Sequence, residues 1–142
     1  NVIMRILGLD FGSKTVGVAI TDPLGMTAQG MEIVRRESPN KLRKTLSRIE
    51  TIIKENDVEL IVLGLPVNMD GSSGERVEKT KEFADMLTRR SGVEIIFQDE
   101  RLTTVEAYEI MNEAGIKRED RYKYVDQIAA TIILEDYLNS HR

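Results

Sequence analysis

The chain opens with two apolar segments separated by a short turn, and a carboxylate lies inside the first of them. Residues 4–11 and 15–22 are rich in apolar and β-branched side chains, with glycine, serine and lysine at 12–14 between them. This pattern predicts two strands joined by a tight turn. A buried carboxylate without a partner is costly in free energy, so Asp10 requires a metal ion, a cation or hydrogen-bond donors. The segment therefore predicts a functional site as well as a strand.

The alternation of side chains along this strand gives Asp10 a particular face. Asp10 shares that face with Gly8 and Gly12. The apolar side chains of Leu7, Leu9 and Phe11 lie on the other face. Two glycines beside a carboxylate leave space for a large group to approach, such as metal ions and a phosphodiester. The alternative is local: Asp10 begins an Asx-type turn into Gly12.

The rest of the chain predicts an α/β fold with a mixed five-stranded sheet flanked by helices. Three closely spaced strands form an antiparallel start, and two later strands join in parallel through helical crossovers. We expect a helix that begins with Ser38 as N-cap and Pro39 as its first residue. The expected strands are 4–11, 15–22, 28–35, 60–64 and 93–98. The expected later helices run from a capping box at 72–75 to about 90, from 103 to about 115, and from 123 to 139.

Length and composition limit the class of protein. A chain of 142 residues with 41% hydrophobic and 31% charged residues predicts one globular domain over 1–142. We find no signal peptide and no apolar run of the roughly 20 residues that a membrane span needs, so we expect a cytoplasmic protein without a membrane partner. Met4 is a candidate natural start, which would make residues 1–3 a remnant of cloning.

The absence of cysteine restricts the chemistry of any metal site. With no cysteine and only His141, near the end of the chain, a metal ion must be held by oxygen. Oxygen ligands favour Mg²⁺ or Mn²⁺ over Zn²⁺. The net charge of −4 counts against wholesale electrostatic binding of nucleic acid, although lysines and arginines gathered around one cleft would still permit it.

Two further acids stand at informative positions. Glu100 follows a predicted strand, at the end where open α/β sheets place their ligands. Asp126 precedes the most apolar part of the last helix, where Ala129 and Ala130 would let that helix lie close to the sheet. Each acid also has an ordinary explanation, since Glu100 can be a solvated loop residue and Asp126 a helix N-cap.

Together the three acids indicate metal-dependent chemistry. Carboxylates clustered without cations raise one another's pKa values, so Asp10, Glu100 and Asp126 at one point would call for divalent metal. Two ions about 4 Å apart can activate a water and stabilise the leaving oxygen of a phosphodiester. We therefore expect these residues to be both the metal ligands and the catalytic set, with two Mg²⁺ or Mn²⁺ ions.

Several strings in the chain resemble the motifs of the YqgF/RuvX family, in order. They cover nearly the whole chain and are Gly8-Leu9-Asp10-Phe11-Gly12 with the following Ser13 to Ala19, Gly64-Leu65-Pro66 with Met69-Asp70-Gly71, Asp99-Glu100-Arg101-Leu102-Thr103-Thr104, and Asp126 with Ala129-Ala130. The string from Asp99 to Thr104 is specific, whereas the opening motif alone is weak. The resemblance implies an RNase H-like fold and a metal-dependent nuclease that matures the 5′ end of 16S ribosomal RNA. The family was also labelled as Holliday junction resolvase, so cleavage of branched DNA is the alternative.

Basic residues near the acids are candidates for contacts with nucleic acid. Phosphate contacts from lysine and arginine, or from the amide groups at a helix N-terminus, would position such a substrate. The candidates are Lys14, Arg101, Thr103, Lys117, Arg118 and Arg121. Each has an equally ordinary explanation, as a solvated side chain, an ion-pair partner or a helix cap.

Two other classes of protein stay open. Sugar-kinase-like phosphotransferases also begin with an Asp-x-Gly turn, but they need a second domain that this length does not supply. A non-catalytic nucleic-acid-binding module would keep the fold, although it could replace the three acids freely. A resolvase cuts two strands symmetrically and usually acts as a dimer. We expect a monomer or a weak homodimer.

Overall fold

The computed structural model describes residues 4–66, 74–100 and 103–141. Within these residues, five strands and four α-helices follow one another in the order expected from the sequence, with one additional 3₁₀ helix before the last α-helix. The elements are β1 (Arg5–Phe11), β2 (Thr15–Thr21), β3 (Ala28–Arg35), α1 (Arg43–Glu55), β4 (Val58–Leu65), α2 (Glu75–Ser91), β5 (Glu94–Asp99), α3 (Thr103–Glu113), η1 (Arg118–Lys123) and α4 (Val125–Ser140).

The strands form one mixed sheet in the order β3-β2-β1-β4-β5. The first three strands pair antiparallel, and β4 and β5 pair in parallel beside β1. This confirms the predicted sheet. The helical crossovers through α1 and α2 explain it, because consecutive parallel strands need a long connection of that kind.

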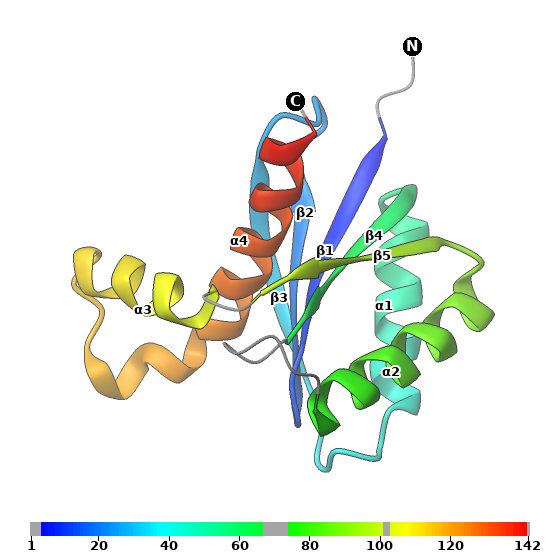
Figure 1. Cartoon of the computed structure of the whole chain (residues 1–142), viewed down its shortest axis with the longest axis horizontal. Coiled ribbons are helices and arrows are strands. Elements are labelled where there is room, and N and C mark those ends of the chain that lie inside the picture. Colours follow the sequence, from blue (N-terminus) through cyan, green and yellow to red (C-terminus); the bar gives the residue numbers. More distant parts are fainter. Residues whose placement is uncertain (1–3, 67–73, 101–102, 142) are drawn as a thin grey trace.

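Helices cover both faces of the sheet (Figure 1). On one face α1 and α2 pack over an apolar layer that includes Leu7, Leu9 and Phe11. On the other face α4 packs over Ile6 and its neighbours. Successive side chains of β1 therefore point to opposite layers, as its alternation predicts. Asp10 consequently lies on the α4 face of the sheet.

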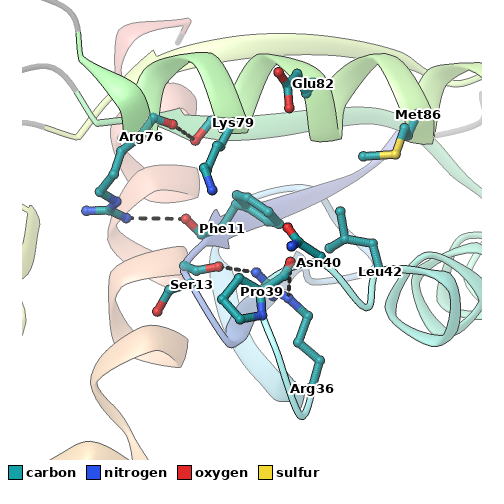
Figure 2. A pocket seen from close by; sticks show the side chains of 12 residues that line it. Phe11, Ser13, Arg36, Pro39, Asn40, Leu42, Arg76, Lys79, Glu82 and Met86 are labelled. Carbon is teal, nitrogen blue, oxygen red and sulfur yellow. Dashed lines mark hydrogen bonds between the residues drawn. The ribbon is translucent and has the colours of Figure 1, made fainter.

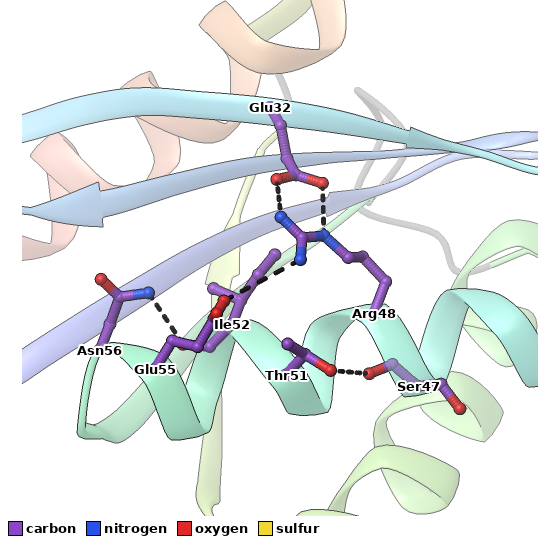
Figure 3. Close-up of polar contacts among 7 residues, drawn as sticks. All are labelled: Glu32, Ser47, Arg48, Thr51, Ile52, Glu55 and Asn56. Atoms are coloured by element: carbon purple, nitrogen blue, oxygen red, sulfur yellow. Dashed lines mark hydrogen bonds and ion pairs between the residues drawn. The ribbon is translucent and has the colours of Figure 1, made fainter.

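The first helix starts later than expected. Ser38 and Pro39 do not begin α1; the backbone amide of Lys41 instead donates to the Ser38 carbonyl in a turn, and α1 begins at Arg43. A serine before a proline suits a turn as well as a helix start, so the local pattern could not separate the two. Further along α1, Arg48 donates twice to the Glu32 carboxylate and links the helix to β3 (Figure 3).

Two glycines let α4 approach the sheet closely. At Gly8 a Cβ atom would meet the Leu134 side chain and the Ala130 carbonyl, and at Gly17 it would overlap the backbone of Asp126. The space beside Gly8 is therefore filled by α4, and the expectation that it is kept for metal or substrate is wrong. Gly17 brings the first turn of α4 onto β2, which fixes the height of Asp126 over the sheet.

Among the described residues, the helices are too short or too polar to cross a lipid bilayer.

Candidate active site

The candidate site lies at the carboxyl ends of the parallel strands. Because β1, β4 and β5 run in the same direction, their last residues reach one edge of the sheet. Asp10 lies near the end of β1 and is buried, with only 9% of its surface exposed. It is thus a strand residue facing α4, and not the start of an Asx turn.

Glu100 reaches Asp10 across a glycine in the strand between them. Leu9 of β1 pairs with Leu63 of β4, so Gly64 is the next β4 residue beside Asp10. A Cβ atom on Gly64 would stand 3.0 Å from the Glu100 carboxylate. The missing side chain leaves room for the Glu100 carboxyl group to lie over β4. Gly64, more than Gly8, is the glycine that opens the site.

The carboxyl groups of Asp10 and Glu100 share a hydrogen bond. Burial, the nearby charge of Asp10 and this bond together raise the pKa of Glu100 to about 9. Burial also raises the pKa of Asp10, which the hydrogen bond from Glu100 partly offsets. Near neutral pH Glu100 therefore keeps its proton in the metal-free protein and donates it in the hydrogen bond to Asp10.

Asp126 stands near this pair but makes a different contact. It lies in the first turn of α4, whose N-cap is Tyr124, so Asp126 is not the cap of that helix. Its Oδ2 accepts a hydrogen bond of 2.5 Å from the Thr15 hydroxyl at the start of β2. Its charge contributes to the raised pKa of Asp10. The fold thus brings the three predicted acids to one end of the sheet.

The side chains fit a divalent cation chemically, although they are not arranged around one. Over the described parts of the chain, no three acidic or histidine side chains stand in a ready metal-binding group. All the available donors are carboxylate oxygens, which suit Mg²⁺ and Mn²⁺. In the same described parts, Glu100 Oε1 is buried and has no hydrogen-bond partner. A buried acceptor of this kind can serve as a ligand to a cation.

Cations lie around the acids. Arg76, in the first turn of α2, donates a hydrogen bond of 3.3 Å to the carbonyl of Phe11, and its charge lowers the pKa values of both Asp10 and Glu100. Lys14 is exposed in the turn between β1 and β2. Both residues therefore place positive charge at the edge of the sheet that carries the acids.

The structure places the other predicted contact residues unequally. Arg101 lies outside the described residues, as does most of the loop that follows Gly64. Thr103 is buried, and its backbone amide donates to the Glu100 carbonyl. This amide orients Glu100 and is therefore engaged within the protein.

The basic residues before α4 lie on η1 and the residue that precedes it. Lys117 and Arg118 are exposed, while Arg121 is partly buried and donates to the Asn112 side chain at the end of α3. The role of Lys117 and Arg118 in binding stays a prediction, whereas Arg121 joins η1 to α3.

Thr15 and Arg76 also contact or influence the acids, and they were not found from the sequence as site residues. Thr15 is 111 positions from Asp126, and only the packing of α4 on β2 brings them together. Arg76 carried a weak signal, since it opens the helix after a central strand, the place where α/β proteins often bind anions.

The sequence matches a known protein family over nearly its whole length. The RuvX family, described as Holliday junction resolvase, matches residues 4–140. A protein of Agathobacter rectalis called "Putative pre-16S rRNA nuclease" is 65% identical over 136 residues, which are 96% of this chain and 95% of that protein. A protein of Myxococcus xanthus with the same name is 48% identical and covers 98% of this chain and 90% of its own length.

Solved structures support the fold. The RuvC protein of Thermus thermophilus, in complex with a Holliday junction substrate, aligns with a TM-score of 0.56 and 14% identity. The alignment covers 98% of this chain and 96% of that one. At this identity the likeness concerns the fold alone, and it confirms the predicted RNase H-like architecture. From the family match and the identity to its relatives, the chain belongs to the RuvX family, also called YqgF, as the sequence motifs predicted.

Proposed function

We propose that this protein is a metal-dependent nuclease that hydrolyses phosphodiester bonds at the 5′ end of precursor 16S ribosomal RNA. The observation that carries the proposal is the carboxyl pair of the buried Asp10 and the half-buried Glu100 beside Asp126, at the carboxyl ends of parallel strands. The curated relatives at 65% and 48% identity bear the name of this activity.

Each part of the site has a role in this reaction. Asp10, Glu100 and Asp126 would hold Mg²⁺ or Mn²⁺, two ions by the usual arrangement, which supply an activated water and stabilise the leaving oxygen. Thr15 orients Asp126 through its hydroxyl, and the Thr103 amide orients the backbone of Glu100. Arg76 and Lys14 would draw the negatively charged strand toward the acids.

The pair of acids must lose its shared proton before a cation can bind there. A proton on Glu100 occupies a carboxylate position that a cation needs, so metal binding releases it. Among the described residues, the buried Oε1 of Glu100 has no hydrogen-bond partner, which supports this exchange. An rRNA-processing role would place the protein in the cytoplasm. The proposed form there is a monomer or a weak homodimer.

The experiment compares cleavage of a precursor 16S RNA, which carries its unprocessed 5′ end, by wild type and Asp10→Asn in Mn²⁺. Wild type is expected to cut at the precursor end. Asp10→Asn, Glu100→Gln and Asp126→Asn are each expected to show no detectable cleavage while their circular dichroism spectra match wild type. Full activity in Asp10→Asn would overturn the mechanism.

A four-way DNA junction in the same assay tests the second candidate function, which the description of the RuvX family favours. Symmetric cutting of the junction with no cleavage of the precursor RNA would assign resolvase activity instead. Asp10→Asn is the control for contaminating nuclease in both arms.

A further inference from the structure

A separate pocket lies beside the acids, on the opposite face of the sheet. Its volume is about 200 Å³, and it is bounded by the turn between β1 and β2, the segment after β3 and one side of α2. Phe11 forms part of its wall, directly after Asp10 in the chain. The pocket and the acids are therefore neighbours at the same edge of the sheet.

The pocket is positively charged although the protein is acidic overall. Three cations line it, Arg36, Arg76 and Lys79, against one carboxylate, that of Glu82. Three positive charges and one negative charge leave an excess of two positive charges, in a chain whose net charge is −4. Figure 2 shows Arg76 and Lys79 reaching from α2 toward Phe11 and Ser13. The concentration of cations here predicts an anionic ligand.

Arg36 is held in place and has unused capacity to donate. Its guanidinium lies 4.8 Å from the centre of the Phe11 ring and donates to the carbonyls of Gly12 at 2.5 Å and Pro39 at 3.4 Å. Among the described residues its Nη1 is buried without a hydrogen-bond partner, and Arg36 forms no salt bridge. A fixed, partly buried guanidinium that lacks an anionic partner is suited to phosphate.

Arg76 connects the pocket to the acids. Its side chain lines the pocket and donates a hydrogen bond to the Phe11 carbonyl. Its charge lowers the pKa values of Asp10 and Glu100 on the other side. Lys79 lies one turn further along α2, half-exposed, and forms a 3.7 Å ion pair with the exposed Glu75. Such a pair contributes little free energy in water, so Lys79 can exchange it for a ligand.

We propose that this pocket binds a backbone phosphate of the substrate strand, next along the strand to the phosphodiester that is cut. The proposal rests on the nuclease function proposed above and adds a second contact point to it. With one phosphate held by Arg36 and Lys79, the strand passes Arg76 and presents the following phosphodiester to the acids. The pocket thus sets which bond of the strand reaches Asp10. The ligand chemistry is the phosphodiester backbone, which RNA and DNA share.

The test measures binding of a short single-stranded RNA to the full chain without divalent metal, at several KCl concentrations, for two variants of α2. Lys79→Ala removes a pocket cation, and Lys81→Ala removes an exposed lysine of the same helix that does not line the pocket. Lys79→Ala is expected to weaken binding about three- to tenfold and to lower the slope of log affinity against log salt by about 0.7. Lys81→Ala is expected to behave as wild type.

A second measurement locates the ligand. In wild type the RNA is expected to shift the amide resonances of Gly12, Ser13 and Asn40, and the matched DNA strand to shift the same amides if the backbone alone is bound. Equal binding and equal salt slopes for Lys79→Ala and Lys81→Ala, or unmoved amides at these positions, would overturn the pocket proposal. That failure is distinct from failure of the nuclease function, which appears as retained cleavage by Asp10→Asn.

Discussion

At the scale of single residues, the site depends on a pair of carboxyl groups, Asp10 and Glu100, whose burial raises both pKa values. Asp10 and Glu100 meet over Gly64 because β4 carries no side chain there. Burial and mutual repulsion keep a proton on Glu100, whose pKa is raised to about 9. The free-energy cost of placing Asp10 and Glu100 together depends on pH, and that dependence can be measured.

Metal-free protein is expected to lose stability as the pH rises from about 5 to about 9. Because the pKa of Glu100 is higher in the folded chain than its ordinary 4.5, the folded state binds its proton more tightly than the unfolded state does. The resulting stability is fully present below pH 4.5 and is lost as the pH rises toward 9. Melting temperatures in chelator should fall by several degrees across this range.

Glu100→Gln is expected to flatten that profile, since the amide keeps a neutral donor to Asp10 at every pH. Glu59→Gln changes an exposed glutamate on β4 and should keep the wild-type slope. If Glu100→Gln and wild type lost stability in parallel between pH 5 and pH 9, the protonated pair would not exist.

At the scale of elements, the position of α4 on the sheet decides where Asp126 lies. Gly8 and Gly17 allow this contact, and the small side chains of Ala129 and Ala130 are buried with it. The Thr15 hydroxyl then bonds the Asp126 carboxylate. The helix α4 therefore places Asp126 beside Asp10 of β1 and Glu100, which follows β5.

Gly17→Ala is expected to destabilise the protein by about 1–3 kcal/mol, because its Cβ would overlap the backbone of Asp126 and push α4 from β2. Urea unfolding measures this change. Gly12→Ala is the comparison, since its Cβ would meet the Thr15 hydroxyl at 3.1 Å and a small adjustment relieves the contact. A smaller loss in Gly17→Ala than in Gly12→Ala would contradict the proposed fit of α4.

At the scale of the whole molecule, the sequence predicted the sheet and its three acids because both depend on local patterns. Three of these patterns can be identified along the chain: the alternation in β1, the apolar run of β4 and the order of the motifs. Contacts between distant segments were not readable: Thr15 with Asp126, Glu100 over Gly64, and Gly8 against Leu134. The start of α1 was misplaced because a serine and a proline suit both a turn and a helix.

The charge of the whole molecule is also uneven in a way that composition hides. A net charge of −4 argues against general affinity for nucleic acid, yet Lys14, Arg36, Arg76 and Lys79 gather at the edge that carries the acids. Their attraction acts over a short range at physiological salt. Such a distribution of charge favours contact with a nucleic-acid strand at this edge of the sheet over contact elsewhere on the protein surface.

The most direct test of the account is calorimetric titration of Mn²⁺ into wild type, Asp10→Asn and Asp85→Asn. Asp85 is an exposed aspartate on α2, away from the three acids, so its variant is a matched control for the lost charge. We expect wild type and Asp85→Asn to bind Mn²⁺ alike, with proton release near neutral pH, and Asp10→Asn to lose this binding. Binding of Mn²⁺ to Asp10→Asn with wild-type affinity would contradict it.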